Sequence, residues 1–164
     1  MAEPAEMAEM AEPALDDGLL SGMERAAEAG ARVLLDAFAR LEQLEIRAKS
    51  PANFVSEADV GAEAAIREVL LALCPDAAFH GEESGYSGGS SGREWVVDPL
   101  DGTTNFLCGI PHFCIAIALR QDGRTTHALV HQPLTGERFT AVLGCGARRS
   151  GSWLISPWMT WILG

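Results

Sequence analysis

The apolar residues of this chain change their spacing once, and that change limits the fold more than any other sequence feature. From Leu20 to Leu41 they recur every three or four positions, which predicts an amphipathic helix with one buried stripe. Ser56 is a suitable N-cap for a second helix, which we expect to run to about Leu73 with Pro75 after its end. Beyond that point apolar residues alternate or stand in short runs, as they do in strands.

Several later segments have strand character, and turn sequences such as residues 121–124 and 133–136 separate the last three. Short turns join antiparallel neighbours. We therefore expect an α+β fold, a layered sandwich in which two helices cover a largely antiparallel sheet. The Gly-rich run 85–92 has no lysine, so we expect a flexible surface connection there rather than a phosphate-binding loop. The expected strands are residues 77–80, 95–97, 113–119, 126–132 and 138–143.

The charge balance excludes some classes of partner. The chain has 164 residues, with 23 acidic and 12 basic side chains and a formal net charge of −11. A nucleic-acid-binding protein needs basic surface to replace the counterions of the phosphates, so we expect no nucleic-acid partner. Residues 1–17 hold six of the acids and no base, in a repeat that we expect to be a disordered tail.

The two ends of the chain also bear on its location. Residues 150–164 are uncharged and contain three of the four tryptophans, but 15 residues with a proline are short of the ~20 that a spanning helix needs. The N-terminus has no basic and apolar segments of a secretory signal. The four cysteines are scattered, as in reduced intracellular proteins. We expect a cytoplasmic protein without membrane contact.

The chemistry is concentrated between Trp95 and Phe106. An apolar strand ends at Asp98, and Asp101 follows across a proline-containing turn. Such a turn can bring two carboxylates and a backbone carbonyl to one point, which suits a hard cation such as Mg²⁺. Glu82 follows the preceding strand, and if the two strands are neighbours it joins the same site. Three carboxylates at one point repel one another unless a cation lies among them.

A phosphate site is expected directly beside these acids. Gly102 allows a tight backbone path, and Thr103 and Thr104 can begin a helix. The free N–H groups at a helix N-terminus bind phosphate. Cation ligands next to a phosphate site are what a metal-dependent phosphoester hydrolase requires.

These motifs resemble the inositol monophosphatase family, which belongs to a superfamily with the fructose bisphosphatases. The resemblance rests on residues 81–84 and 98–106 and extends from about Leu20 to Gly151. It implies the layered α/β sandwich of that family with the C-terminal α/β half missing, since the family's Trp-Asp-x-Ala-Ala-Gly motif is absent from this sequence. We expect an N-terminal half over residues 18–149 and an atypical apolar tail over 150–164, from a truncated or frame-shifted reading of a longer gene.

The resemblance implies Mg²⁺-dependent hydrolysis of inositol monophosphate to inositol and phosphate by an activated water. Asp98 and Asp101 would also help to bind a second ion. Asp59 would act through Thr103 or through a bound water, and Lys49 lies near the phosphate in the family. The implied metal ligands are Glu82, Asp98, the carbonyl of Leu100 and Asp101; the catalytic residues are Glu82, Thr103 and Asp59; the substrate and phosphate are bound by Gly102, Thr103, Thr104 and Asp101.

Two alternatives stay open from the sequence. One is a related phosphatase that acts on a sugar phosphate, a nucleotide or histidinol phosphate. The other is a catalytically inactive fragment that serves only as a binding module. The expected partner is a small phosphorylated substrate, and the family resemblance also allows a homodimer.

Overall fold

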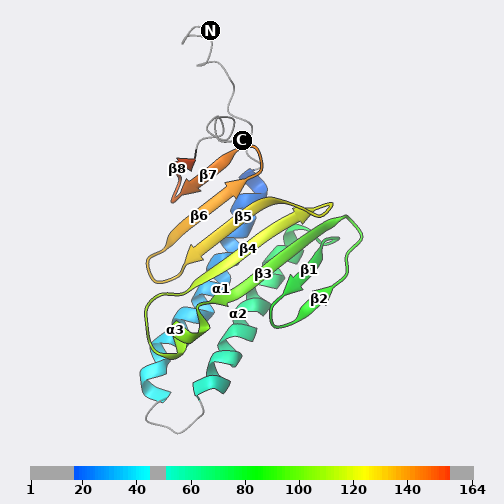
Figure 1. The fold of residues 1–164 in the computed structure, drawn as a ribbon. Helices are drawn as coiled ribbons and strands as arrows, with labels where there is room; N and C mark the ends of the chain where they lie inside the picture. The colour runs from blue at the N-terminus through cyan, green and yellow to red at the C-terminus, as the bar shows by residue number, and fades with distance from the viewer. Residues whose placement is uncertain (1–16, 45–50, 156–164) are drawn as a thin grey trace.

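The computed structural model describes residues 17–44 and 51–155, in which an eight-stranded sheet carries two long helices on one face (Figure 1). The helices are α1 (Asp17–Leu44) and α2 (Pro51–Leu73), and the short helix α3 (Thr103–Leu107) follows the third strand. The strands are β1 (Ala78–Gly81), β2 (Gly85–Ser87), β3 (Arg93–Asp101), β4 (Cys114–Gln121), β5 (Arg124–Gln132), β6 (Glu137–Val142), β7 (Gly146–Arg149) and β8 (Ser152–Ile155).

The order of the strands in the sheet is β2-β1-β3-β4-β5-β6-β7-β8. After β1 the chain forms β2 on the outer side of β1, and then returns to place β3 on its inner side. β3 is parallel to β1, and the remaining neighbouring pairs are antiparallel. The predicted α+β fold with a largely antiparallel sheet is confirmed.

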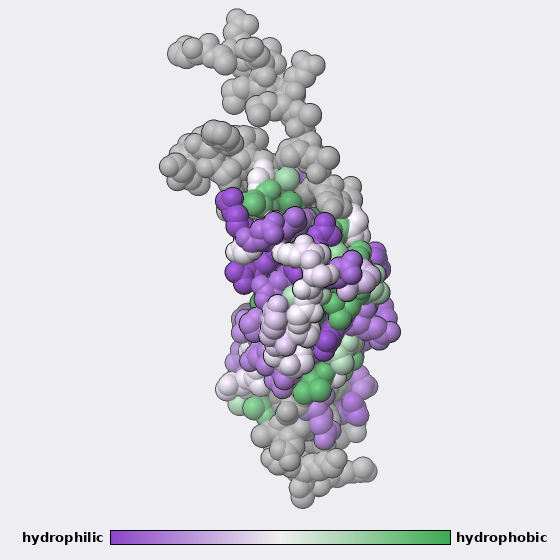
Figure 2. Space-filling view, turned by 90° about the vertical axis from the view of Figure 1, so that its right-hand side faces the viewer, coloured by the Kyte–Doolittle hydropathy of each residue, from purple (hydrophilic) through white to green (hydrophobic). Residues whose placement is uncertain are grey.

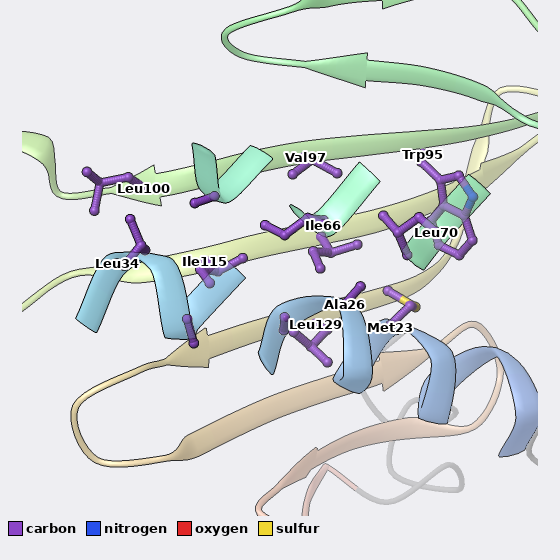
Figure 3. Close-up of a cluster of buried hydrophobic side chains, with 14 of the residues drawn as sticks. Met23, Ala26, Leu34, Ile66, Leu70, Trp95, Val97, Leu100, Ile115 and Leu129 are labelled. Atoms are coloured by element: carbon purple, nitrogen blue, oxygen red, sulfur yellow. The ribbon is translucent and has the colours of Figure 1, made fainter. Parts of the chain in front are cut away.

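The main core lies between the two helices and the sheet. Figure 3 shows Met23 and Leu34 of α1 and Ile66 and Leu70 of α2 pointing toward the strands, and Trp95 of β3 is fully buried with them. Alanines in the stripe of α1 are buried as well, so the two helices can lie close together. The 3–4 spacing in the sequence therefore marks the face of α1 that packs against the rest of the fold.

The other face of the sheet has a different character. Leu129 is 1% exposed beneath the helices, whereas its neighbour Val130 points to the opposite face and is 37% exposed. That face carries small half-buried residues such as Ala116 and Ala118. Within the described ranges, no helix covers it (Figure 1).

The β2 end of the sheet is seen in Figure 2, where hydrophilic residues predominate among the described ones and a few apolar residues lie between them. Polar side chains at the edge of a sheet oppose pairing with another chain.

Some predicted boundaries were wrong. Helix α2 begins at Pro51, five residues before the expected cap Ser56. Proline favours the first position of a helix, because the N–H that it lacks has no partner there. The expected flexible run 85–92 begins with β2, which pairs with β1. β7 and β8 extend the sheet beyond the last expected strand.

Three features expected from the sequence lie outside the residues that the structure describes. Residues 1–16 of the acidic tail, Lys49 and residues 156–164 of the apolar tail belong to this group. The proposed division at 17/18 and 149/150 stays a prediction. Of the helices in the described ranges, none has both the length and the apolar character required to cross a membrane.

Candidate active site

Strand β3 ends in an irregularity that puts two carboxylates on one face of the sheet. Asp98 lies opposite Ala116 of β4, and Asp101 lies opposite Cys114, so three steps along β3 match two steps along β4. The extra residue makes this a β-bulge. In a regular strand, side chains three positions apart point to opposite faces. Because of the bulge, Asp98 and Asp101 share a face.

The parallel pairing of β1 with β3 brings a third carboxyl group to this place. Gly81 lies opposite Val97, and the next residue, Glu82, donates its N–H to the carbonyl of Val97 at 3.2 Å. Burial, followed by the hydrogen bond and the negative charge of Glu82, raises the pKa of Asp98 from its ordinary value of 3.8 to about 6. The structure therefore brings Glu82 and Asp98 together at the ends of two neighbouring strands.

Helix α2 supplies a fourth carboxyl group from below the sheet. Asp59 is 5% exposed, and its Oδ1 has no hydrogen-bond partner. Burial raises the pKa of Asp59 from 3.8 to about 7, and the negative charges of Glu83, Glu82 and Asp98 raise it further in that order. A buried carboxyl without a partner keeps its proton near neutral pH unless a positive charge is supplied.

A buried acid that the sequence analysis missed lies one turn along α2. Glu63 is 3% exposed, and its two carboxyl oxygens accept the N–H groups of Glu83 and Ser84 at 2.8 and 2.9 Å. The signal was present in the sequence, since Glu63 stands four positions after Asp59, between the apolar positions Ala62 and Ile66. A carboxylate on the buried stripe of a helix needs a partner.

The turn into α3 forms the other side of the site. Gly102 has φ +93°, a left-handed conformation, and a side chain there would meet the carbonyl of His112 at 3.1 Å. Glycine is therefore required on both grounds. The hydroxyl of Thr103 donates to the carbonyl of Leu100 at 3.0 Å. Helix α3 starts without a side-chain cap, so side chains leave its first N–H groups open to a ligand.

A cavity of about 250 Å³ adjoins one of the acids, Asp101, and is lined by Asp101, Gly102, Asn105, His112, Phe113, Cys114 and Gln132. The Sγ of Cys114 lies 3.6 Å from Oδ2 of Asp101 as a donor. Burial and the charge of Asp101 raise the pKa of this thiol to about 11, so it stays protonated and is not a thiolate nucleophile at neutral pH. All four cysteines lie in the described ranges, and each is a free thiol.

The residues at this place fit a hard cation. Their donors are oxygens only, from Glu82, Asp98, Asp101 and the carbonyl of Leu100, which is the set that Mg²⁺ prefers. A positive charge among them would offset the repulsion that raises the pKa of Asp98 and would also oppose the negative charges that raise the pKa of Asp59. In the described part of the chain, no three His, Cys, Asp or Glu side chains already stand as a finished ligand group, so binding requires these carboxylates to adjust.

Comparison with known proteins identifies the family of this chain. The sequence model of the inositol monophosphatase family matches residues 16–157. This chain belongs to the inositol monophosphatase family. The match extends six residues past Gly151, where the resemblance seen in the sequence ended, and it includes β8.

Two curated relatives illustrate the similarity. The chain is 45% identical over 130 residues to the inositol-1-monophosphatase of Rhizobium meliloti, covering 79% of this chain and 49% of the relative. It is 43% identical over 125 residues to Nus factor SuhB of Pasteurella multocida, covering 76% of this chain and 47% of the relative. The chain therefore spans about half the length of the curated relatives that it matches.

Solved structures show the same fold. The SuhB protein of Bartonella henselae superposes with a TM-score of 0.73 at 36% identity, over 82% of this chain and 53% of that one. The inositol monophosphatase of Anabaena superposes with a TM-score of 0.67 at 30% identity, over 81% and 47%. The expected layered α/β fold of the inositol monophosphatase family is confirmed.

Within this family fold, the predicted site residues lie where β1 and β3 end, and beside these strand ends. Glu82 and Asp98 contact each other, Asp59 of α2 is near enough for their charges to raise its pKa, and Asp101 lies on the same face as Asp98. The carbonyl of Leu100 and the hydroxyl of Thr103 are bonded to each other, next to Gly102 and Thr104 at the start of α3. Their catalytic roles stay a prediction.

Proposed function

We propose that this chain carries the cation-binding and phosphate-binding part of a Mg²⁺-dependent phosphoric monoester hydrolase that converts inositol monophosphate to inositol and phosphate. The observation that supports the proposal is the meeting of Glu82, Asp98 and the buried Asp59 where the parallel strands β1 and β3 end, beside the start of α3. Acids that gather over a buried carboxyl group, next to an uncapped helix start, are suited to a cation and a phosphate together.

Glu82, Asp98, Asp101 and the carbonyl of Leu100 would hold Mg²⁺ in this proposal. When bound, Mg²⁺ lowers the pKa of water and neutralises charge on a phosphoryl group. The bulge in β3 is what allows Asp98 and Asp101 to serve one ion, because it turns both side chains to one face.

The protein's own groups would then direct the attacking water. The hydrogen of the Thr103 hydroxyl is engaged by the carbonyl of Leu100, so Oγ1 of Thr103 can accept a hydrogen bond from the water. Glu82 can take the proton as a general base. Asp59 of α2 has an Oδ1 atom without a hydrogen-bond partner, and in the proposal this atom orients the water through a second hydrogen bond.

The backbone N–H groups of Gly102, Thr103 and Thr104 would bind the phosphate oxygens. Gly102 is required here because its left-handed conformation turns the chain sharply from β3 into α3. Asp101 borders both this turn and the adjacent cavity, so it contacts the substrate as well as the cation in the proposal. We propose a small phosphorylated substrate in that cavity and, from four free thiols, a cytoplasmic location.

A second candidate function rests on length. Because the chain spans about half of its relatives, it could bind a cation or a phosphorylated ligand without turning it over. A related substrate, such as a sugar phosphate, a nucleotide or histidinol phosphate, is the other alternative.

Phosphate release from inositol 1-phosphate, measured with and without Mg²⁺, tests the proposal. We expect release that needs Mg²⁺ and falls at least ~100-fold in Asp98→Asn, whose amide retains the shape of the side chain without its charge. Glu68→Gln is the matched control, since Glu68 is an exposed acid of α2 away from the site. No Mg²⁺-dependent release, with Asp98→Asn equal to the parent, would leave the binding-module alternative. Faster release from histidinol phosphate or a nucleotide would correct the substrate.

A further inference from the structure

Glu63 is a buried acid whose two oxygens serve one turn of backbone. Its carboxyl group lies under the turn that follows β1, with Oε2 2.8 Å from the N–H of Glu83 and Oε1 2.9 Å from the N–H of Ser84. The side chain comes from α2, twenty positions earlier, and is 3% exposed. These two hydrogen bonds tie the helix layer to the sheet layer beside the acids of the site.

The backbone leaves room for this carboxyl group at one glycine. A side chain on Gly81 would lie 2.3 Å from Oε2 and 2.6 Å from Oε1 of Glu63, closer than atoms can approach. The φ of Gly81 is not in the left-handed region, so the backbone itself would accept alanine. A side chain at Gly81 would therefore have to displace the carboxyl group of Glu63, while the conformation of β1 would accept it.

The turn that Glu63 holds is the one that carries Glu82. Glu82 is fixed on one side by its N–H bond to Val97 of β3. Its next two residues are fixed on the other side by Glu63. Rotation of this short segment would move the carboxyl group of Glu82 away from Asp98.

We infer that Glu63 is a positioning residue that aims Glu82 at Asp98 and thereby sets the affinity of the site for a divalent cation. The inference rests on the proposed function, because Glu82 is a cation ligand only there. Glu63 itself contacts neither cation nor substrate. It acts through the amides of Glu83 and Ser84, as outer hydrogen-bond partners of metal ligands do.

Four full-length variants test this inference against the parent chain. Glu63→Gln retains the size of the side chain, but one of its two acceptors becomes an NH₂ group that faces an N–H. Gly81→Ala reaches the same contact from the other side by displacing the carboxyl group. The third variant combines both changes, and Glu68→Gln removes an exposed acid of α2 as the matched control.

Two readouts are measured on each folded variant. Mn²⁺ affinity is followed by the electron paramagnetic resonance signal of free Mn²⁺. Hydrogen exchange at the amides of Glu83 and Ser84 is followed by nuclear magnetic resonance. We expect Glu63→Gln and Gly81→Ala each to weaken Mn²⁺ binding ~10–100-fold and to accelerate exchange at these two amides selectively. The double variant should bind Mn²⁺ no more weakly than the single variant with the lower affinity, because both changes break the same contact.

Contrary outcomes separate the two claims. Mn²⁺ affinity within twofold of the parent in a folded Glu63→Gln, or unchanged exchange at the two amides, overturns the role of Glu63. Additive losses in the double variant also overturn it, since they would mean separate contacts. A parent chain that binds no Mn²⁺ overturns the proposed function, and amide exchange then still decides whether Glu63 holds the turn.

Discussion

Asp59 is an ionisable side chain in a place that solvent hardly reaches. Its neighbours within the site are acids, and its Oδ1 has no hydrogen-bond partner. A carboxyl group in such surroundings is stable as the neutral acid or beside a cation, and unstable as a bare charge. The same holds more weakly for Asp98, which is bonded to Glu82. These two residues therefore make the stability of the chain depend on pH and on cations.

The pH dependence has a definite sign. The pKa of folded Asp59 is about 7, above its ordinary 3.8, so the folded state binds more protons than the unfolded state between these values. Its stabilising contribution is full below pH 3.8 and is lost as the pH rises through 7. In the presence of a chelator, the free energy of unfolding of Asp59→Asn minus that of the parent should therefore be larger at pH 8 than at pH 5. Urea unfolding at both pH values measures this, and an equal difference at both would contradict it.

The substitution Asp98→Asn should raise the stability of the metal-free chain but reduce the stability that the chain gains from Mg²⁺. Asp98→Asn removes the repulsion with Glu82 and retains an acceptor for the N–H of Leu100, so the metal-free chain should become more stable. The parent should gain about 2.7 kcal/mol at a Mg²⁺ concentration one hundred times its Kd, and the variant less than a third of that. Thermal unfolding with chelator and with Mg²⁺ tests both parts. Equal gains in the two proteins would argue against Asp98 as a ligand.

At the scale of elements, the site depends on where β1 and β3 end and α3 begins. Sequence patterns predicted α1 and the strands β4 to β6 well, because these carry clear apolar periodicity, but of β3 (Arg93–Asp101) they predicted residues 95–97 alone. The short strand β2 consists of Gly85, Tyr86 and Ser87, and it exists through its pairing with β1 rather than through a pattern of its own. Short strands of this kind are set by tertiary contacts, which a single sequence does not display.

The site was predictable from the sequence only where it depends on local motifs. The motif around Asp98 and Asp101 is local, so the sequence contained it. The nearness of Glu82 needed only the assumption that β1 and β3 are neighbours. The partnership of Glu63 with the turn after β1 depends on how α2 lies against the sheet, and no local pattern contains that information.

The junction of β3 and α3 gives a prediction at this scale. Gly102→Ala would place a side chain on a residue with φ +93° and 3.1 Å from the carbonyl of His112. The expected cost is about 1–3 kcal/mol of unfolding free energy, measured by urea denaturation. Gly88→Ala is the control, because Gly88 is exposed and has 4.0 Å of space to its nearest neighbour. A loss in Gly88→Ala as large as that in Gly102→Ala would mean that the backbone argument is wrong.

At the scale of the molecule, the sheet is covered on one side. Both long helices lie on the same face, and Arg138 of β6 joins this layer through a 2.5 Å ion pair with Glu28 of α1. The opposite face holds smaller side chains that are only half-buried in the described ranges. The two faces of the sheet are therefore unequal in side-chain size and burial.

This inequality predicts very different costs for two adjacent substitutions. Leu129→Ala should cost about 2–5 kcal/mol, since it opens a cavity between β5 and the helices. Val130→Ala, on the exposed face, should cost less than about 1 kcal/mol. Urea unfolding of both variants at one protein concentration gives the comparison. A similar large cost at Val130 would show that its face is covered in solution.

The bulge in β3 has a consequence for which changes the site can accept. Because Asp98 and Asp101 share a face only through one extra residue, the number of residues between them matters more than their identity. Leu100 is 1% exposed in the core, so a replacement there must also be apolar and of similar size. Deleting either Pro99 or Leu100 would restore a regular alternation, with the two acids two positions apart and one intervening residue carbonyl in place of two. In this stretch the spacing of the two acids determines whether they can serve one site.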